Sequence, residues 1–164
     1  MAVDLTNFGL TIEQPLFEGQ IYSAKRFDAD SLANSLGAVF PFGRVIVETT
    51  EGQAALPSAT GQNVVGIHGA TFVNEQIKDS NGDSGVPSNQ PVTNVSRGQV
   101  SVYFEEAVGV GDPVFFRHTA GGGGSIVGRF RNDADTATCD QISAARVVVG
   151  TTAAGLGVIE INLP

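Results

Sequence analysis

The sequence predicts an all-β protein, a single-domain β-barrel or β-sandwich of about eight to nine short, mostly antiparallel strands with an extended N-terminal arm. Residues 98–131 carry the clearest two-residue alternation. Val100, Val102 and Phe104 share one side of an extended strand, and the residues between them share the other. The chain also has 21 glycines among its 164 residues, and they interrupt the apolar runs as hairpin turns do.

The first 15 residues are predicted to form an arm outside the domain. They mix polar and apolar residues without a sustained period and end at Pro15. Because chain termini become ordered mainly when something holds them, we expect a partner or a neighbouring subunit to order residues 1–15. Residues 16–164 are expected to form the domain, with a first strand over residues 16–24.

Residues 25–37 are the one place in the first half of the chain where a helix is predicted. Asp28, Asp30 and Ser31 precede Leu32, and such side chains favour a helix start because they cap its free N–H groups. The pattern therefore predicts one or two helical turns.

The next apolar run, residues 39–48, is interrupted by Pro41 and Gly43. Because proline cannot donate to a strand ladder, this predicts a bend or an edge position, with the strand proper over residues 44–48.

The following run, residues 63–73, contains Gly66 and Gly69, which is typical of a sharply twisted or bulged strand. After it, residues 74–94 form a long polar stretch with an Asn-Gly turn and two prolines. Such a length exceeds that of an ordinary connection and indicates a role in interaction.

The second half of the chain is predicted to consist of hairpins. The glycine run 121–124 forms a flexible tip, and the strand pattern resumes over residues 125–131. Residues 144–150 and 157–163 are expected to pair as a closing hairpin.

Charge excludes several kinds of partner. Seventeen acidic residues against nine basic ones give a formal net charge of -8, which repels phosphate backbones, so no nucleic-acid partner is expected. A local basic patch of Arg117, Arg129 and Arg131 remains an alternative, but pairing of these arginines with acidic neighbours is favoured. No apolar segment is long enough to span a bilayer, so no membrane association is expected either.

Three short motifs suggest chemistry that their surroundings do not support. Residues 82–85 read Gly-Asp-Ser-Gly, as around a trypsin-like nucleophile, but the chain is too short for the two barrels of such a protease. Asp79, Asn81 and Asp83 copy the start of a calcium loop whose later ligands are missing. The glycine run 121–124 lacks the lysine and the helix of a phosphate loop.

The remaining polar residues do not form an obvious site either. Glu105 and Glu106 are expected on opposite faces of a strand, so that they do not converge. His68 and His118 have no partner nearby in the sequence, and the single cysteine, Cys139, is expected to be structural. The sequence therefore predicts no catalytic, cofactor-binding or metal site.

The segments RGQVSVYFEEAVGVGDPVFFR, GRFR and AARVVVGTTAAGLGVIEINLP, with FPFGRVIVE and NVVGIHGA before them, resemble the head cement (decoration) proteins of tailed bacteriophages. The resemblance spans most of residues 36–164 and leaves out residues 1–15 and 74–94. It implies a non-enzymatic protein that is made in the bacterial cytoplasm and clusters on the outer head surface of the virion. Its implied partners are the major capsid protein and itself, as a homotrimer or alternatively a dimer.

Contact with those partners is expected at exposed residues of the arm and the hairpins, namely Asp4, Phe8, Phe17, Tyr103, Glu105, Arg129 and Arg131. Two other functions remain alternatives: a trimeric β-barrel enzyme of the dUTPase type, and a carbohydrate- or receptor-binding module of a phage tail. The first lacks the expected tyrosine-containing and C-terminal glycine-rich motifs. The second is disfavoured because the chain has no Trp and two Tyr to stack on sugars.

Overall fold

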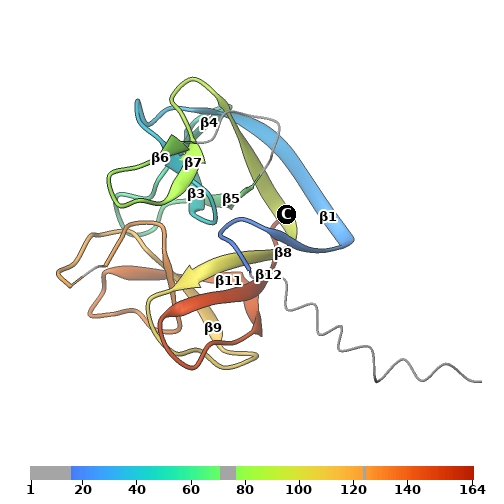
Figure 1. Cartoon of the computed structure of the whole chain (residues 1–164), viewed down its shortest axis with the longest axis vertical. Helices are drawn as coiled ribbons and strands as arrows, with labels where there is room; N and C mark the ends of the chain where they lie inside the picture. Colours follow the sequence, from blue (N-terminus) through green and yellow to red (C-terminus); the bar gives the residue numbers. More distant parts are fainter. Residues whose placement is uncertain (1–15, 71–76, 124) are drawn as a thin grey trace, which may run out of the picture.

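The computed structural model describes residues 16–70, 77–123 and 125–164, and these residues form strands and no helix. Twelve strands lie in a nine-stranded sheet and a separate three-stranded sheet (Figure 1). The all-β prediction is therefore confirmed. The predicted arm, with Asp4 and Phe8, lies outside the described residues.

The strands, in chain order, are β1 (Ile21–Asn34), β2 (Phe40–Pro41), β3 (Val45–Thr50), β4 (Gln53–Ala55), β5 (Val64–Gly69), β6 (Ile77–Lys78), β7 (Ser84–Val86), β8 (Pro91–Phe104), β9 (Pro113–Arg117), β10 (Phe130–Arg131), β11 (Cys139–Val149) and β12 (Gly155–Asn162).

The large sheet closes into two cycles of paired strands that share β8. One cycle runs β1-β4-β3-β5-β8 and is closed by the β1–β8 pairing; the other runs β8-β10-β9-β11-β12 and is closed by the β8–β12 pairing. In Figure 1 the other strands of the first cycle lie beside the upper part of β8, and those of the second cycle lie lower. Among the described strands the β1–β4 and β8–β10 pairs are parallel and the others antiparallel, as predicted. The fold is layered like a sandwich rather than one clean barrel.

Strand β8 forms the centre of the molecule because it is covered on both sides. Val100, Val102 and Phe104 lie in the main core, as the alternation predicts. On the opposite side Ser101 is also fully buried. The incoming chain pairs with its backbone: Gly19 N donates to Ser101 O at 2.8 Å, and Ser101 N donates to Gln20 O at 2.9 Å. The entry segment is thus part of the fold.

The predicted helix within residues 25–37 is wrong, because β1 continues as a strand to Asn34. Its residues from Asp28 to Ala33 pair with β8, after register shifts between Ser23 and Ala29. The ladder satisfies many backbone groups at once, which outweighs a local capping signal.

Two other boundaries also differ from the prediction. The stretch 74–94 is not one long loop, since β7 pairs with both β2 and β6 in the small sheet and β8 already begins at Pro91. The strand expected over residues 125–131 is reduced to Phe130–Arg131.

The first strand, predicted over residues 16–24, begins only at Ile21 and runs on to Asn34. Three other element predictions hold. Pro41 lies in β2, at the edge of the small sheet. The β3–β5 pairing shifts register beside Gly66, as expected for a bulged strand. Strands β11 and β12 pair as the closing hairpin. Among the described residues, no helix is long and apolar enough to cross a membrane.

Gly19 is expected to tolerate no side chain. Its φ is +78°, and a Cβ would lie 2.8 Å from both Ala70 N and His68 O. We predict that Gly19→Ala lowers the free energy of unfolding by at least about 2 kcal/mol, measured by urea denaturation.

Gly37→Ala is the matched control, because Gly37 has a similar φ of +67° but nothing within 4 Å of its Cβ position. It should cost only the backbone term of about 1 kcal/mol. Equal costs at the two positions would contradict the role of close packing at Gly19.

Candidate protein-contact site

The structure places the five described contact candidates in different surroundings. Phe17 is 40% exposed at the entry to the fold. Tyr103 lies under Arg129, whose guanidinium carbon is 4.3 Å from the ring centroid, a cation–π arrangement. Glu105 and Arg131 take part in ion pairs of a cluster around Arg117. Whether any of them contacts a partner stays a prediction.

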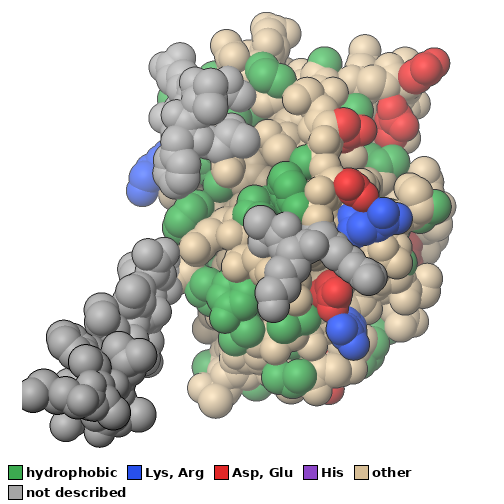
Figure 2. All heavy atoms as spheres, turned by 90° about the vertical axis from the view of Figure 1, so that its right-hand side faces the viewer, with side chains coloured by type: hydrophobic (Ala, Val, Ile, Leu, Met, Phe, Trp, Pro, Cys, Tyr) green, Lys and Arg blue, Asp and Glu red, His purple; other side chains and the backbone are tan. Residues whose placement is uncertain are grey.

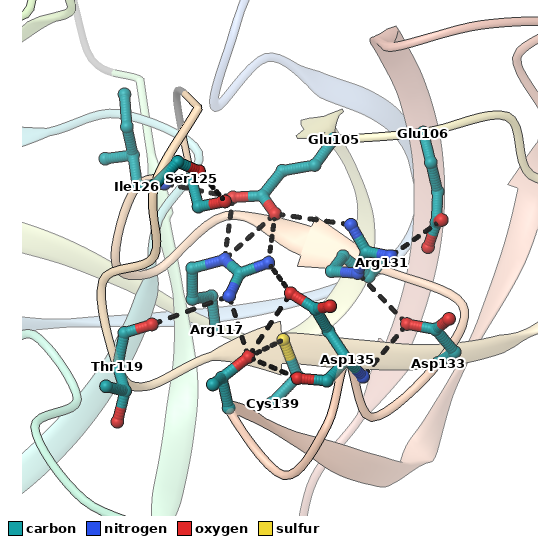
Figure 3. A network of polar contacts seen from close by, with 12 residues as sticks. Glu105, Glu106, Arg117, Thr119, Ser125, Ile126, Arg131, Asp133, Asp135 and Cys139 are labelled. Carbon is teal, nitrogen blue, oxygen red and sulfur yellow. Dashed lines mark hydrogen bonds and ion pairs between the residues drawn. The ribbon is translucent and has the colours of Figure 1, made fainter.

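A cluster of ion pairs, which we call the Arg117 cluster, surrounds the buried guanidinium of Arg117 in β9 (Figure 3). Its side chain is 1% exposed and that of Glu105 is 7% exposed. Arg117 Nε and Nη2 donate to Glu105 at 2.9 and 2.6 Å, Nη2 also donates to Asp135 at 2.5 Å, and Nη1 donates to Thr138 Oγ1 at 2.8 Å. Such charge-assisted, forked bonds are the strong class of hydrogen bond.

These bonds change the proton affinities within the cluster. The hydrogen bonds with Glu105 raise the pKa of Arg117 above its ordinary value, against the effect of burial. The hydrogen bond from Arg117 lowers the pKa of Asp135. Burial raises the pKa of the Cys139 thiol beside the cluster, which disfavours the reactive thiolate and agrees with the structural role predicted for this cysteine.

Glu105 and Glu106 do converge, contrary to the prediction. Strand β8 ends at Phe104, so two-residue alternation no longer applies to them. Both carboxylates approach Arg131: Nη1 lies 3.7 Å from Glu105 Oε2 and Nη2 lies 2.8 Å from Glu106 Oε2. The guanidinium between them makes this an ion-pair cluster rather than an acid and base pair.

The cluster also holds an unusual loop between β10 and β11. Asp135, Thr136 and Ala137 have φ values of 36°, 55° and 64°, and none of them is glycine. Left-handed backbone is unfavourable for such residues. The bonds from Arg117 to Asp135 and Thr138 bracket the three residues and fix the loop in this form.

A separate cluster of ion pairs, around Arg44, joins the small sheet to both cycles. The Arg44 side chain is buried and pairs with Asp83, which also accepts from Arg129 Nη2 at 3.1 Å. Glu18 lies 4.0 Å from Arg44, and burial raises the pKa of its carboxyl. Desolvation lowers the pKa of Arg44. The favoured sequence interpretation, that the arginines pair with acidic neighbours, is thereby confirmed for Arg117, Arg129 and Arg131.

The same contacts explain the calcium-like motif. Asp83 is occupied by two arginines, and Asp79 Oδ1 accepts from the backbone of Asn81 and Asp83 at 2.8 and 2.9 Å. Within the described residues, no group of three acidic, His or Cys side chains is placed to hold a metal ion. The motif forms the turn of the β6–β7 hairpin.

The two histidines have different surroundings. His68 is fully buried against Phe40 and Phe42, and its Nδ1 lies 3.0 Å from Pro41 O, so Nδ1 carries the proton. His118 Nδ1 lies 2.9 Å from Thr119 Oγ1, and its Nε2 lies 3.7 Å from Asp140. That second distance is too long for a hydrogen bond, and Asp140 already accepts from Thr60 and Gly61. Thr119, His118 and Asp140 therefore do not form the continuous hydrogen-bonded chain of a catalytic triad.

Arg44, Glu18 and Asp135 were not found by sequence reasoning. Arg44 and Asp83 are 39 positions apart, so only the topology brings them together. One signal was present in the composition: seven of the nine basic residues are Arg, the residue suited to buried, forked ion pairs.

Comparison with known proteins shows to which family the chain belongs. A family model described as structural cement protein (E217 gp24/Pam3 gp6) matches residues 6–163. The chain belongs to this phage structural cement protein family. The match covers residues 74–94 and most of residues 1–15, so the cement-protein likeness extends further than the sequence motifs indicated.

A solved structure supports the same fold. A chain from the capsid of Myoviridae phage XM1 is 14% identical to this cement-family chain, with a TM-score of 0.70 over 90% of each chain. At that identity the likeness establishes the architecture. The comparison with curated proteins finds no match.

His68 predicts how the stability of this cement-family protein depends on pH. Burial lowers the pKa of His68 from 6.5 to about 4. Between these values the unfolded chain takes up a proton that the folded chain refuses, so stability falls as the pH drops from about 6.5 to 4. The loss from this group amounts to about 3 kcal/mol, at about 1.4 kcal/mol per unit.

The measurement is urea denaturation at pH 7 and pH 4 of the natural protein and of His68→Gln, which keeps an N–H donor but does not titrate. Groups that titrate in both proteins cancel in the comparison. The pH-dependent loss should be about 3 kcal/mol smaller in the variant. The same loss in both proteins would exclude His68 as its source.

Proposed function

We propose that this chain is a non-enzymatic capsid cement protein that binds the outer surface of a phage head and clamps neighbouring major capsid subunits. The observation that carries the proposal is the family match over residues 6–163. Bound copies would stabilise the mature shell by mass action, because each favours the lattice that it binds over the disrupted one.

The physical properties of the domain support this role. A cement protein must hold a fixed shape under load, and the two arginine clusters tie loops of both cycles and the small sheet to buried ion pairs. The net charge of -8 suits a surface that faces away from packaged nucleic acid. Its location would then be the outer head surface of the virion.

The contacts are proposed to come from the N-terminal arm and the residues near it. Asp4 and Phe8 of the arm and Phe17, which is 40% exposed, would meet neighbouring subunits. Tyr103 and Arg129 would add a preformed, partly covered cation–π pair. The protein is also proposed to associate with itself, as a homotrimer or alternatively as a dimer.

The test uses phage heads produced without this protein. Purified full-length protein should bind them saturably in co-sedimentation and raise the temperature at which they release DNA. Heads that already carry the protein serve as the control and should take up no further copies. Absence of binding to the deficient heads would contradict the proposal.

A further inference from the structure

The outer face of β8, β12 and β11 carries ordered rows of polar side chains. The pairing registers place Gln99 opposite Glu160 and Glu160 opposite Arg146, and they place Arg97 opposite Asn162. These five residues, which we call the polar face, line a hollow of about 580 Å³. Small residues in the same hollow, among them Gly98 and Ala144, leave the backbone open to close approach.

The charges of the polar face and its border balance. Arg146 Nε and Nη2 donate to Glu160 Oε2 at 2.9 and 2.6 Å. Arg97 Nε donates to Asn162 Oδ1 at 2.7 Å, and its Nη1 donates to Asp28 Oδ2 at 2.8 Å. Two cations and two anions sum to zero. The Arg97 and Arg146 side chains are 42% and 69% exposed, so both guanidinium groups also reach solvent.

This balance differs from the rest of the molecule. The chain carries a net charge of -8. Four of its arginines, Arg44, Arg117, Arg129 and Arg131, form largely covered ion pairs and contribute little positive charge to the surface. Figure 2, which turns the side with β1 toward the viewer, shows some basic side chains lying against acidic ones and further acidic side chains with no basic neighbour. Two copies therefore repel each other at long range, and the repulsion is least where these neutral pairs meet.

We propose that the polar face is the contact between copies of this chain. A surface with both signs complements itself, because around a rotation axis the arginines of one copy can meet the carboxylates of the next. A purely acidic partner would instead meet Asp28 and Glu160, and a purely basic one would be drawn to the acidic surface elsewhere. This contact concerns self-association alone and does not depend on capsid binding.

The test is sedimentation equilibrium of the purified full chain over a range of concentrations. Arg146→Glu should weaken self-association by at least about tenfold, because it places like charges in the contact. Lys78→Glu is the control: it makes the same charge change at an exposed residue of β6, outside the polar face, and should leave association near that of the natural protein.

A second variant, Ala144→Gln, fills the hollow without changing any charge and should also weaken association. Thermal unfolding checks that each variant folds. Association of Arg146→Glu equal to that of Lys78→Glu would overturn the proposal, and so would a monomeric natural protein at millimolar concentration. If head binding rather than self-association were lost in Arg146→Glu, the face would belong to a capsid partner and the proposal would also fall.

Discussion

Replacing Arg117 by methionine is expected to lower the free energy of unfolding by about 3–5 kcal/mol. The change leaves the nearly covered carboxylate of Glu105 without its main partner and frees Asp135 and Thr138. Removing one member of a buried ion pair is costly because the other charge stays desolvated. Urea denaturation at neutral pH measures the loss.

Two further variants make this result specific. Arg117→Met with Glu105→Gln should lose less than Arg117→Met alone, because the uncompensated charge is gone while an acceptor for Ile126 N remains. Arg146→Ala, which breaks an exposed pair, should cost no more than about 1 kcal/mol. An Arg117→Met protein as stable as Arg146→Ala would show that the cluster does not hold the fold.

Deleting residues 1–15 is expected to abolish most of the occupancy on heads while leaving the domain folded. The described fold begins at Leu16, and its contacts from Gly19 onward remain in the shortened chain. Occupancy on protein-deficient heads is measured by quantitative gel analysis after sedimentation, and the unfolding midpoint is measured in parallel.

The full-length variant Asp4→Asn with Phe8→Ala asks whether these two arm residues carry the effect. If they do, its occupancy should fall toward that of the deletion. Unchanged occupancy after the deletion itself would refute the role of the arm, whatever the double variant does.

The alternation in β8 was predictable because a two-residue period depends only on neighbouring positions. Val100, Val102 and Phe104 are buried as the pattern predicts. Ser101 is buried as well, and its backbone pairs with residues 19 and 20, which no local pattern indicates. The helix predicted within residues 25–37 is wrong because the pairing that replaces it joins residues far apart in the sequence. Its capping residues signal a local preference, and pairing with β8 lies outside any local window.

Several residues of the candidate site could be predicted from the sequence, but their ion-pair partners could not. The preference for Arg over Lys indicated forked ion pairs, and Glu105, Arg129 and Arg131 were chosen from the sequence. Their partners are fixed by topology, as Arg129 with Asp83 illustrates across 46 positions. Sequence alternation also fails where a strand ends, which is why Glu105 and Glu106 meet at one arginine.

The central claim, that this chain is a cement protein of the outer head surface, is tested most directly by cryo-electron microscopy of the virion. The proposed function predicts additional density for a protein of 17.0 kDa on the outside of the shell, in contact with neighbouring capsid subunits, that fits the two strand cycles around β8. A head whose outer surface shows no such density, with the protein found elsewhere in the particle or not at all, would contradict it.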